Sequence, residues 1–186
     1  MTFSIGLSPM LWSKPLQVVA ITQDFGAIAK AVGGDHVTVS TLVKGSRNLH
    51  SITPKPSMVV AVRKADLLIR LGMAQDAWID GLIQVARNGS IFPGQNGYID
   101  CSKRISKLEV PEGKLDGRRG DVHKEGNPHY WLNPKNGIVI AQQIRDHLSA
   151  ISPQHEAVFE TNYTVFVRQL TKKITQWQQQ LRQVQD

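Results

Sequence analysis

The sequence predicts an α/β fold, in which a small four-stranded parallel sheet is flanked by helices and followed by one long C-terminal helix. Short apolar runs of strand length alternate with segments of helical periodicity, which is typical of a parallel sheet with right-handed crossovers. The chain has 186 residues, 41% of them hydrophobic, enough for one domain, or one domain with an appendage. The last segment carries a single long apolar stripe, which a domain of this size covers only in part.

The predicted strands are short apolar runs, and most are followed by a segment that reads as a helix. These strands span residues 16–21, 36–43, 66–71 and 97–101. The first is almost entirely apolar, as expected of a strand that is buried on both faces. Helices are expected to begin near Thr22, which is a capping residue type, at Ser57, at Ala77 and at Pro134, whose fixed φ suits a first turn. Gly33 and Gly34 end the first helix.

The terminal helix is predicted from a stripe of apolar residues after Ser152 and Pro153. They recur every three or four positions, about 3.6 on average, as on one face of a helix. The stripe consists of Phe159, Tyr163, Phe166, Leu170, Ile174, Trp177, Leu181 and Val184. This spacing predicts about nine turns and a length on the order of 50 Å.

Charge and cysteine content limit the functions to consider. The 22 basic and 15 acidic residues give a net charge of +7, but the basic residues are scattered, so we expect no nucleic-acid binding. Cys101 is the single cysteine, which excludes an internal disulfide and a cysteine-based zinc site. No stretch reaches the ~18 apolar residues of a membrane-spanning helix.

Two segments are expected to lie outside the folded core. Residues 1–15 lack a basic start and a signal cleavage site, so they read either as the remnant of a signal peptide or as a disordered tail. Residues 102–126 are charged and glycine-rich, which predicts an exposed excursion.

Two histidines are the candidate metal ligands. His50 and His129 each lie in a proline-rich turn that follows a region where a strand can end and precedes a predicted helix. Open α/β sheets place their ligands at the carboxyl ends of strands, and two neutral imidazoles there form half of a transition-metal site. A loop histidine taken alone is more often solvated or hydrogen-bonded. His123 reads either as a third ligand or as a surface residue, with the surface role favoured. Structural roles are expected for His36, His147 and His155.

Five motifs, in their order and spacing, resemble a known family. They are the strand-helix opening from Val18 to Asp35, the loop Leu49-His50-Ser51 leading to Pro54-Lys55-Pro56-Ser57, the segment Lys64-Ala65-Asp66-Leu67, the segment Leu71-Gly72-Met73 to Trp78-Ile79-Asp80, and the most specific piece, residues 127–134 from Asn127 to Pro134. From about Leu16 to its end, the chain resembles the N-terminal half of the cluster A-I solute-binding proteins of bacterial metal ABC transporters, the zinc- and manganese-binding type.

The resemblance implies a domain organisation and a ligand set. Family members have two α/β lobes joined by one long helix, with the metal between the lobes. By this resemblance residues 1–15 are a tail or signal-peptide remnant, 16–150 the metal-binding lobe and 151–186 the linking helix, with the second lobe absent. His50 and His129 match the two histidines that the first lobe supplies. Further ligands, usually a His or Glu and an Asp, come from the second lobe.

The function implied by the resemblance is capture of Zn²⁺, with Mn²⁺ as the alternative, for delivery to a membrane ABC permease. The expected location is the periplasm, although no export signal is evident. An imidazole must be neutral to coordinate, so binding should weaken below about pH 6.5. With two protein ligands, water would fill the remaining positions and the affinity should be far below that of a complete site.

Two other readings stay open. The chain could be a remnant without transport function, or a half that needs a second polypeptide; the apolar stripe of the terminal helix would then be uncovered and should cause self-association. A metallohydrolase is disfavoured because water activation needs three protein ligands and a general base, and no H-E-x-x-H cluster occurs. Cys101 has no recognisable base partner in the sequence, so we expect no enzyme.

Overall fold

A single parallel sheet forms the centre of the protein. The structure, a computed structural model, describes residues 14–45, 47–111 and 123–183. Its strands are β1 (Leu16–Ala20), β2 (Val37–Thr41), β3 (Leu67–Arg70) and β4 (Tyr98–Asp100). They pair in the order β2-β1-β3-β4, with every pair parallel. The predicted four-stranded parallel sheet is therefore confirmed.

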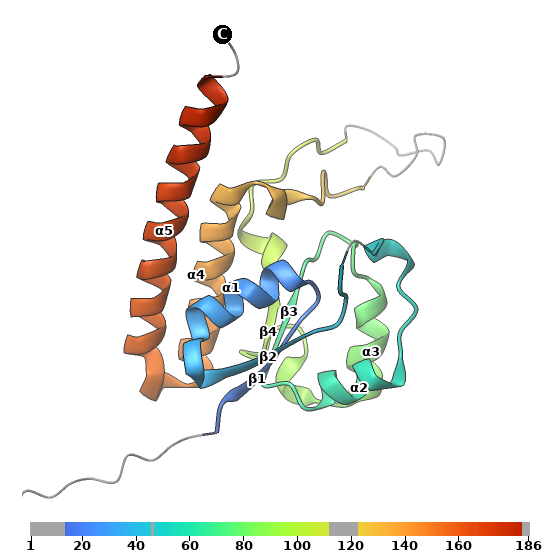
Figure 1. Cartoon of the computed structure of the whole chain (residues 1–186). Coiled ribbons are helices and arrows are strands. Elements are labelled where there is room, and N and C mark those ends of the chain that lie inside the picture. Colours follow the sequence, from blue (N-terminus) through green and yellow to red (C-terminus); the bar gives the residue numbers. More distant parts are fainter. Residues whose placement is uncertain (1–13, 46, 112–122, 184–186) are drawn as a thin grey trace, which may run out of the picture.

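Helices cover both faces of the sheet. They are α1 (Gln23–Gly33), α2 (Pro56–Arg63), α3 (Trp78–Ala86), α4 (Pro134–Ile151) and α5 (Glu156–Arg182). Figure 1 shows α1, α4 and α5 on one side of the sheet and α2 and α3 on the other, which gives three layers. None of the helices in the described ranges is long and apolar enough to cross a membrane.

The core forms where the apolar strands meet these helices. All four residues of β3 are buried, because β3 is paired on both sides and covered on both faces. Phe25 and Ala29 of α1 and Phe159 of α5 are completely buried against the same core. The apolar positions that predicted each element are thus the positions that pack, and this burial is the main source of stability.

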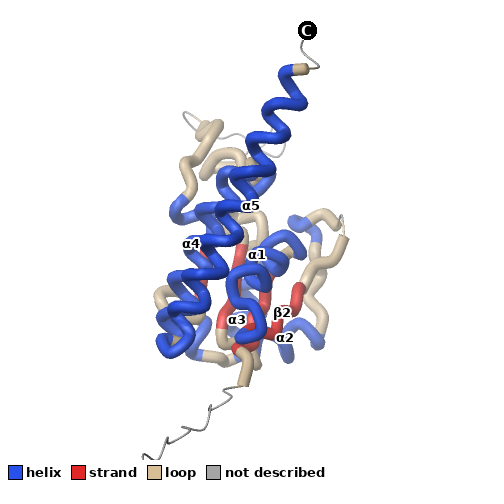
Figure 2. Tube along the Cα trace, turned by 60° about the vertical axis from the view of Figure 1, so that its left-hand side comes forward, coloured by secondary structure: helices blue, strands red, loops and turns tan. Residues whose placement is uncertain are grey.

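The terminal helix is shorter than the predicted nine turns. Residues Pro153–His155 form a separate 3₁₀ turn, and α5 begins only at Glu156, because Ser152 and His155 have non-helical backbone angles. Its 27 residues span about 40 Å at ~1.5 Å per residue. Phe159 is fully buried, whereas Trp177 is 45% and Leu181 is 64% exposed, where α5 extends past the end of α4 (Figure 2). Val184 lies outside the described residues.

Two smaller predictions need correction. Thr22 occupies the N-cap position of α1, but its side chain makes no capping hydrogen bond, and its Oγ1 is buried with no partner among the described residues. The expected exposed excursion starts at Ser102, but Ser102 is buried, because Cys101–Arg104 form a 3₁₀ turn that packs against α4. Most of the N-terminal tail, and residues 112–122 of the excursion, lie outside the described residues.

Candidate metal site

His50 lies beyond the carboxyl end of β2, in a 3₁₀ turn formed by Leu49–Ser51. The side-chain oxygen of Asn48 accepts a 2.9 Å hydrogen bond from the backbone N–H of His50 and so begins this turn. Leu49 packs against the core, while the His50 side chain is exposed. The turn therefore presents the imidazole to solvent from a backbone that is fixed on its inner side.

His129 is held in the same way at the same end of the sheet. It precedes the 3₁₀ turn Tyr130–Leu132, and the side-chain oxygen of Asn127 accepts a 3.0 Å hydrogen bond from its backbone N–H. In Figure 1 this turn and the Leu49–Ser51 turn both lie at the end of the molecule toward which the strands point. The structure therefore brings both predicted histidine segments to the carboxyl edge of the sheet, where open α/β folds usually place their ligands.

Asn127 also orients the ring of His129. Its Oδ1 lies 3.1 Å from Nδ1 of the imidazole, and its Nδ2 donates to Glu109 at 2.9 Å. Because the amide nitrogen is engaged with the carboxylate, the amide oxygen faces the ring, and Nδ1 carries the proton in this hydrogen bond. That assignment leaves the lone pair of Nε2 for a metal ion, with the ring fixed from behind as metal-binding histidines usually are.

His123 lies against His50. The two ring centroids are 5.0 Å apart and the ring planes differ by 23°, so the rings are stacked. Because the lone pairs of an imidazole lie in its ring plane, those of His50 and His123 lie in two nearly parallel planes. Within the described part of the chain no three His, Cys, Asp or Glu side chains gather closely enough to hold a metal ion.

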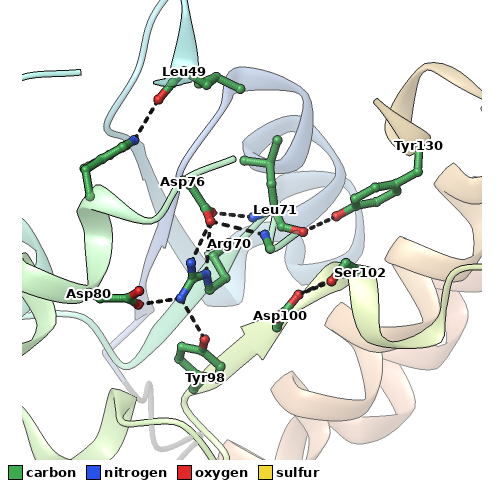
Figure 3. A network of polar contacts seen from close by, with 11 residues as sticks. Leu49, Arg70, Leu71, Asp76, Asp80, Tyr98, Asp100, Ser102 and Tyr130 are labelled. Atoms are coloured by element: carbon green, nitrogen blue, oxygen red, sulfur yellow. Dashed lines mark hydrogen bonds and ion pairs between the residues drawn. The ribbon is translucent and has the colours of Figure 1, made fainter. Parts of the chain in front are cut away.

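The segment between β3 and α3 connects the two histidine turns, and we call residues 71–77 the β3–α3 turn. The carbonyl of Leu71 accepts a 2.6 Å hydrogen bond from the hydroxyl of Tyr130, the neighbour of His129. At the other end, Nε1 of Trp78 donates a 3.0 Å hydrogen bond to the carbonyl of Leu49, the neighbour of His50. Figure 3 marks both bonds as dashed lines.

A buried ion pair fixes this turn. Arg70 donates through Nε and Nη2 to Oδ1 of Asp76, at 3.1 and 2.8 Å. The same carboxylate accepts from the backbone N–H of Leu71 at 2.7 Å and of Gly72 at 3.3 Å. Burial raises the pKa of Asp76, and the Arg70 guanidinium with the two backbone N–H groups opposes that rise. All four partners are donors, so the ionised carboxylate is the form that satisfies them.

The remaining histidines and the cysteine have structural environments. His36 and His155 stack with ring centroids 3.9 Å apart, and Nδ1 of His147 lies 2.7 Å from the carbonyl of Asn96. Cys101 is fully buried, and burial raises the pKa of its thiol well above the usual value. The thiol is therefore protonated in the core, where it packs as a small apolar group.

A comparison with known protein families decides the classification. The model of the family described as zinc-uptake complex component A, periplasmic, matches residues 18–186. The chain belongs to this family. Among curated relatives of this chain, the manganese ABC transporter substrate-binding lipoprotein scaA of Streptococcus gordonii is 29% identical over 163 residues, which are 86% of this chain and 49% of that protein. The lipoprotein PsaA of Streptococcus pneumoniae, also named for manganese, is 28% identical over 161 residues, 84% of this chain and 48% of its own length. The chain thus spans about half the length of these relatives.

Solved structures of metal-binding proteins share the fold of this chain. The Mn-bound periplasmic metal binding protein of Candidatus Liberibacter asiaticus superposes with a TM-score of 0.70 at 22% identity, over 88% of this chain and 55% of that one. The Zn(II)-bound ZnuA-like domain of Streptococcus pneumoniae AdcA gives a TM-score of 0.66 at 24% identity, over 85% and 52% of the two chains. At this identity the likeness concerns the fold alone.

Sequence reasoning found the histidines but missed the groups that hold them. An asparagine two residues before each histidine was a visible signal, although the same local turn also begins α4 at Asn133, with Lys135 in place of the histidine. The pairing of Arg70 with Asp76 left no signal, because a charged residue at the end of an apolar strand usually reads as solvated.

Proposed function

We propose that this chain binds a divalent transition-metal ion through the imidazoles of His50 and His129, as the substrate-binding component of an ABC-type metal importer. The observation that carries the proposal is the presentation of both histidines at one edge of a parallel sheet, each on a turn begun by an asparagine. Membership of the zinc-uptake family supports a metal ion as the ligand. A membrane permease as partner and a periplasmic location belong to the same proposal.

Zinc is the proposed ion, with manganese as the alternative. Zinc takes four ligands in tetrahedral array and binds imidazole nitrogen readily, whereas manganese prefers oxygen ligands and stands lowest in the affinity order of divalent metals. Two exposed imidazoles therefore favour zinc. Water, or groups from outside the described residues, would occupy the other positions, and manganese would become competitive only where those groups are oxygens.

Isothermal titration with zinc tests the proposal. The wild type should bind one ion, and His50→Ala and His129→Ala should each lower the affinity on the order of 100-fold, since even an outer-shell partner of a ligand is worth 10–100-fold. His147→Ala is the matched control, because it removes an imidazole that contacts Asn96 and not the candidate site. Equal zinc binding by the wild type and both site variants would remove the proposal. A parallel titration with manganese decides between the ions.

We also propose that the exposed end of α5 associates with a second copy of the chain. Trp177 and Leu181 lie one helical turn apart, on the same face of α5, and are 45% and 64% exposed. Exposed apolar patches of this kind drive association. Sedimentation velocity should show a concentration-dependent dimer that the double variant Trp177→Gln, Leu181→Gln abolishes. Val85→Gln, which removes an exposed apolar side chain from α3, should leave it unchanged. A wild type that stays monomeric would contradict this proposal.

A further inference from the structure

The β3–α3 turn has an unusual backbone. Gly72, Met73 and Ala74 are consecutive residues with φ of 79°, 51° and 59°, in the left-handed region that side chains disfavour. At Gly72 a Cβ would lie 2.0 Å from Oδ1 of Asp100, so only glycine fits there. Strained backbone of this kind persists only when surrounding contacts determine it, and it is found more often at ligand sites than elsewhere.

The contacts that determine this turn are rigid and buried. The Asp76 side chain is completely buried and accepts hydrogen bonds from Arg70 and from the N–H groups of Leu71 and Gly72. Arg70 is held on its other side by Asp80 at 2.6 Å and by the hydroxyl of Tyr98 at 3.1 Å (Figure 3). The turn therefore has a fixed position relative to β3, which is itself paired on both sides.

Each histidine segment is hydrogen-bonded to this turn or to the residue that directly follows it. Leu71 accepts from Tyr130, whose neighbour is His129, and Trp78, the first residue of α3, donates to Leu49, whose neighbour is His50. Tyr130 is buried, and its hydroxyl is the donor in this bond because a backbone carbonyl can only accept. The two segments are distant in sequence and lie on different loops, yet both are hydrogen-bonded to the same short segment, residues 71–78.

We propose that the β3–α3 turn is the device that sets the separation of His50 and His129, and that Trp78 and Tyr130 are positioning residues for metal binding. The inference rests on the proposed function. It adds that metal affinity depends on two groups that contact no metal, because each imidazole must be held in place before it can share an ion with the other. A loop free to move would lose that freedom on binding and would weaken the affinity accordingly.

A purely structural role would give a different signature, and thermal unfolding with and without zinc separates the two. A ligand raises stability according to its concentration relative to its Kd. If Trp78 and Tyr130 only stabilise the fold, their loss lowers the Tm equally in both conditions and leaves the zinc-induced shift unchanged. If they position the histidines, the zinc-induced shift itself becomes smaller.

The variants for this test are Tyr130→Phe and Trp78→Phe, each of which removes the donor and keeps an aromatic ring. We expect each to raise the Kd for zinc about tenfold, the lower end of the outer-shell range, and to reduce the zinc-induced Tm shift. Tyr163→Phe is the matched control for the first, since it removes a phenol from α5, where the ring lies under the guanidinium of Arg145 in α4. Asn162→Ala, which removes a side-chain donor to the backbone carbonyl of Val32 in α1, is the control for the second.

The outcomes separate this inference from the proposed function. Loss of zinc binding in His50→Ala together with wild-type affinity in Tyr130→Phe and Trp78→Phe would overturn the positioning role and leave the function standing. An equal loss of affinity in Tyr163→Phe and Tyr130→Phe would overturn it as well, because the effect would then be general. Circular dichroism of the metal-free variants checks the fold, and a Tyr130→Phe protein that fails to fold leaves Trp78→Phe to decide.

Discussion

The side-chain oxygen of Asn127 accepts a hydrogen bond from Nδ1 of His129 at 3.1 Å, while Glu109 holds the other end of the same amide at 2.9 Å. This series of hydrogen bonds, from carboxylate to amide to imidazole, fixes both the tautomer and the direction of the ring. An imidazole prepared in this way loses less freedom when it binds an ion.

Asn127→Ala should therefore weaken zinc binding about tenfold, because the ring of His129 loses its orienting partner and the backbone N–H of His129 loses its side-chain acceptor. Isothermal titration measures the effect. Asn162→Ala serves as the control, since its amide donates to the carbonyl of Val32, in α1. An unchanged Kd in Asn127→Ala would show that the hydrogen bond does not contribute to binding.

Asp76→Asn should cost roughly 3–5 kcal/mol of unfolding free energy, since it leaves the charge of Arg70 buried without its main counter-ion. The carboxylate of Asp80, which is 61% exposed, also pairs with Arg70, and Asp80→Asn should cost about 0–1 kcal/mol. Urea unfolding of both variants gives the comparison. Similar losses in the two proteins would mean that burial does not govern the strength of these pairs.

Gly72→Ala should be much more damaging than Gly45→Ala. Both glycines have left-handed φ, 79° and 69°, so each substitution carries a backbone cost of about 1–2 kcal/mol. At Gly72 the new methyl group would also overlap Asp100 and Ser102, whereas at Gly45 nothing lies within 4 Å. The difference in Tm between the two variants measures the steric part. Equal Tm values would show that the β3–α3 turn can move to make room.

Stability should fall as the pH is lowered below about 6.5, through His155. Burial, and then the charge of His36 stacked on it, lower the pKa of His155 from its ordinary 6.5. The unfolded chain therefore binds the proton more readily than the folded chain, and this contribution is complete above pH 6.5 and lost as the pH falls through the lowered value. His155→Gln should flatten the decline in urea midpoint between pH 7.5 and 5.5. Parallel pH profiles for the two proteins would rule out this origin.

The fold was largely predictable because its signals are local. Buried parallel strands such as Leu67–Arg70 are continuous apolar runs, and Gly33 with Gly34 ends α1 as expected. The start of α5 was predicted too early, because Ser152 and Pro153 read as a helix start and form instead a short turn that ends at His155. The 3₁₀ turn Pro153–His155 joins α4 to α5, and the apolar periodicity of α5 does not predict it.

The site was predictable only in part. His50 and His129 could be selected from their turns, and the structure brings both segments to one edge. The hydrogen bonds that support them join residues 29 and 59 positions apart, Trp78 with Leu49 and Tyr130 with Leu71. Such pairs have no periodicity or spacing, so they become visible only after the chain has folded. The ligand roles of the two histidines remain predictions.

The strand order would affect ion selectivity at the proposed metal site. The β3–α3 turn leaves from an inner strand, flanked by β1 and β4, and so takes its position from the least deformable part of the sheet. An ion arriving between the imidazoles would meet a preset gap and would not be able to draw the rings inward to suit its radius. Discrimination among cations would then depend on the distance between the two imidazoles, which the packing of the core would set before an ion binds.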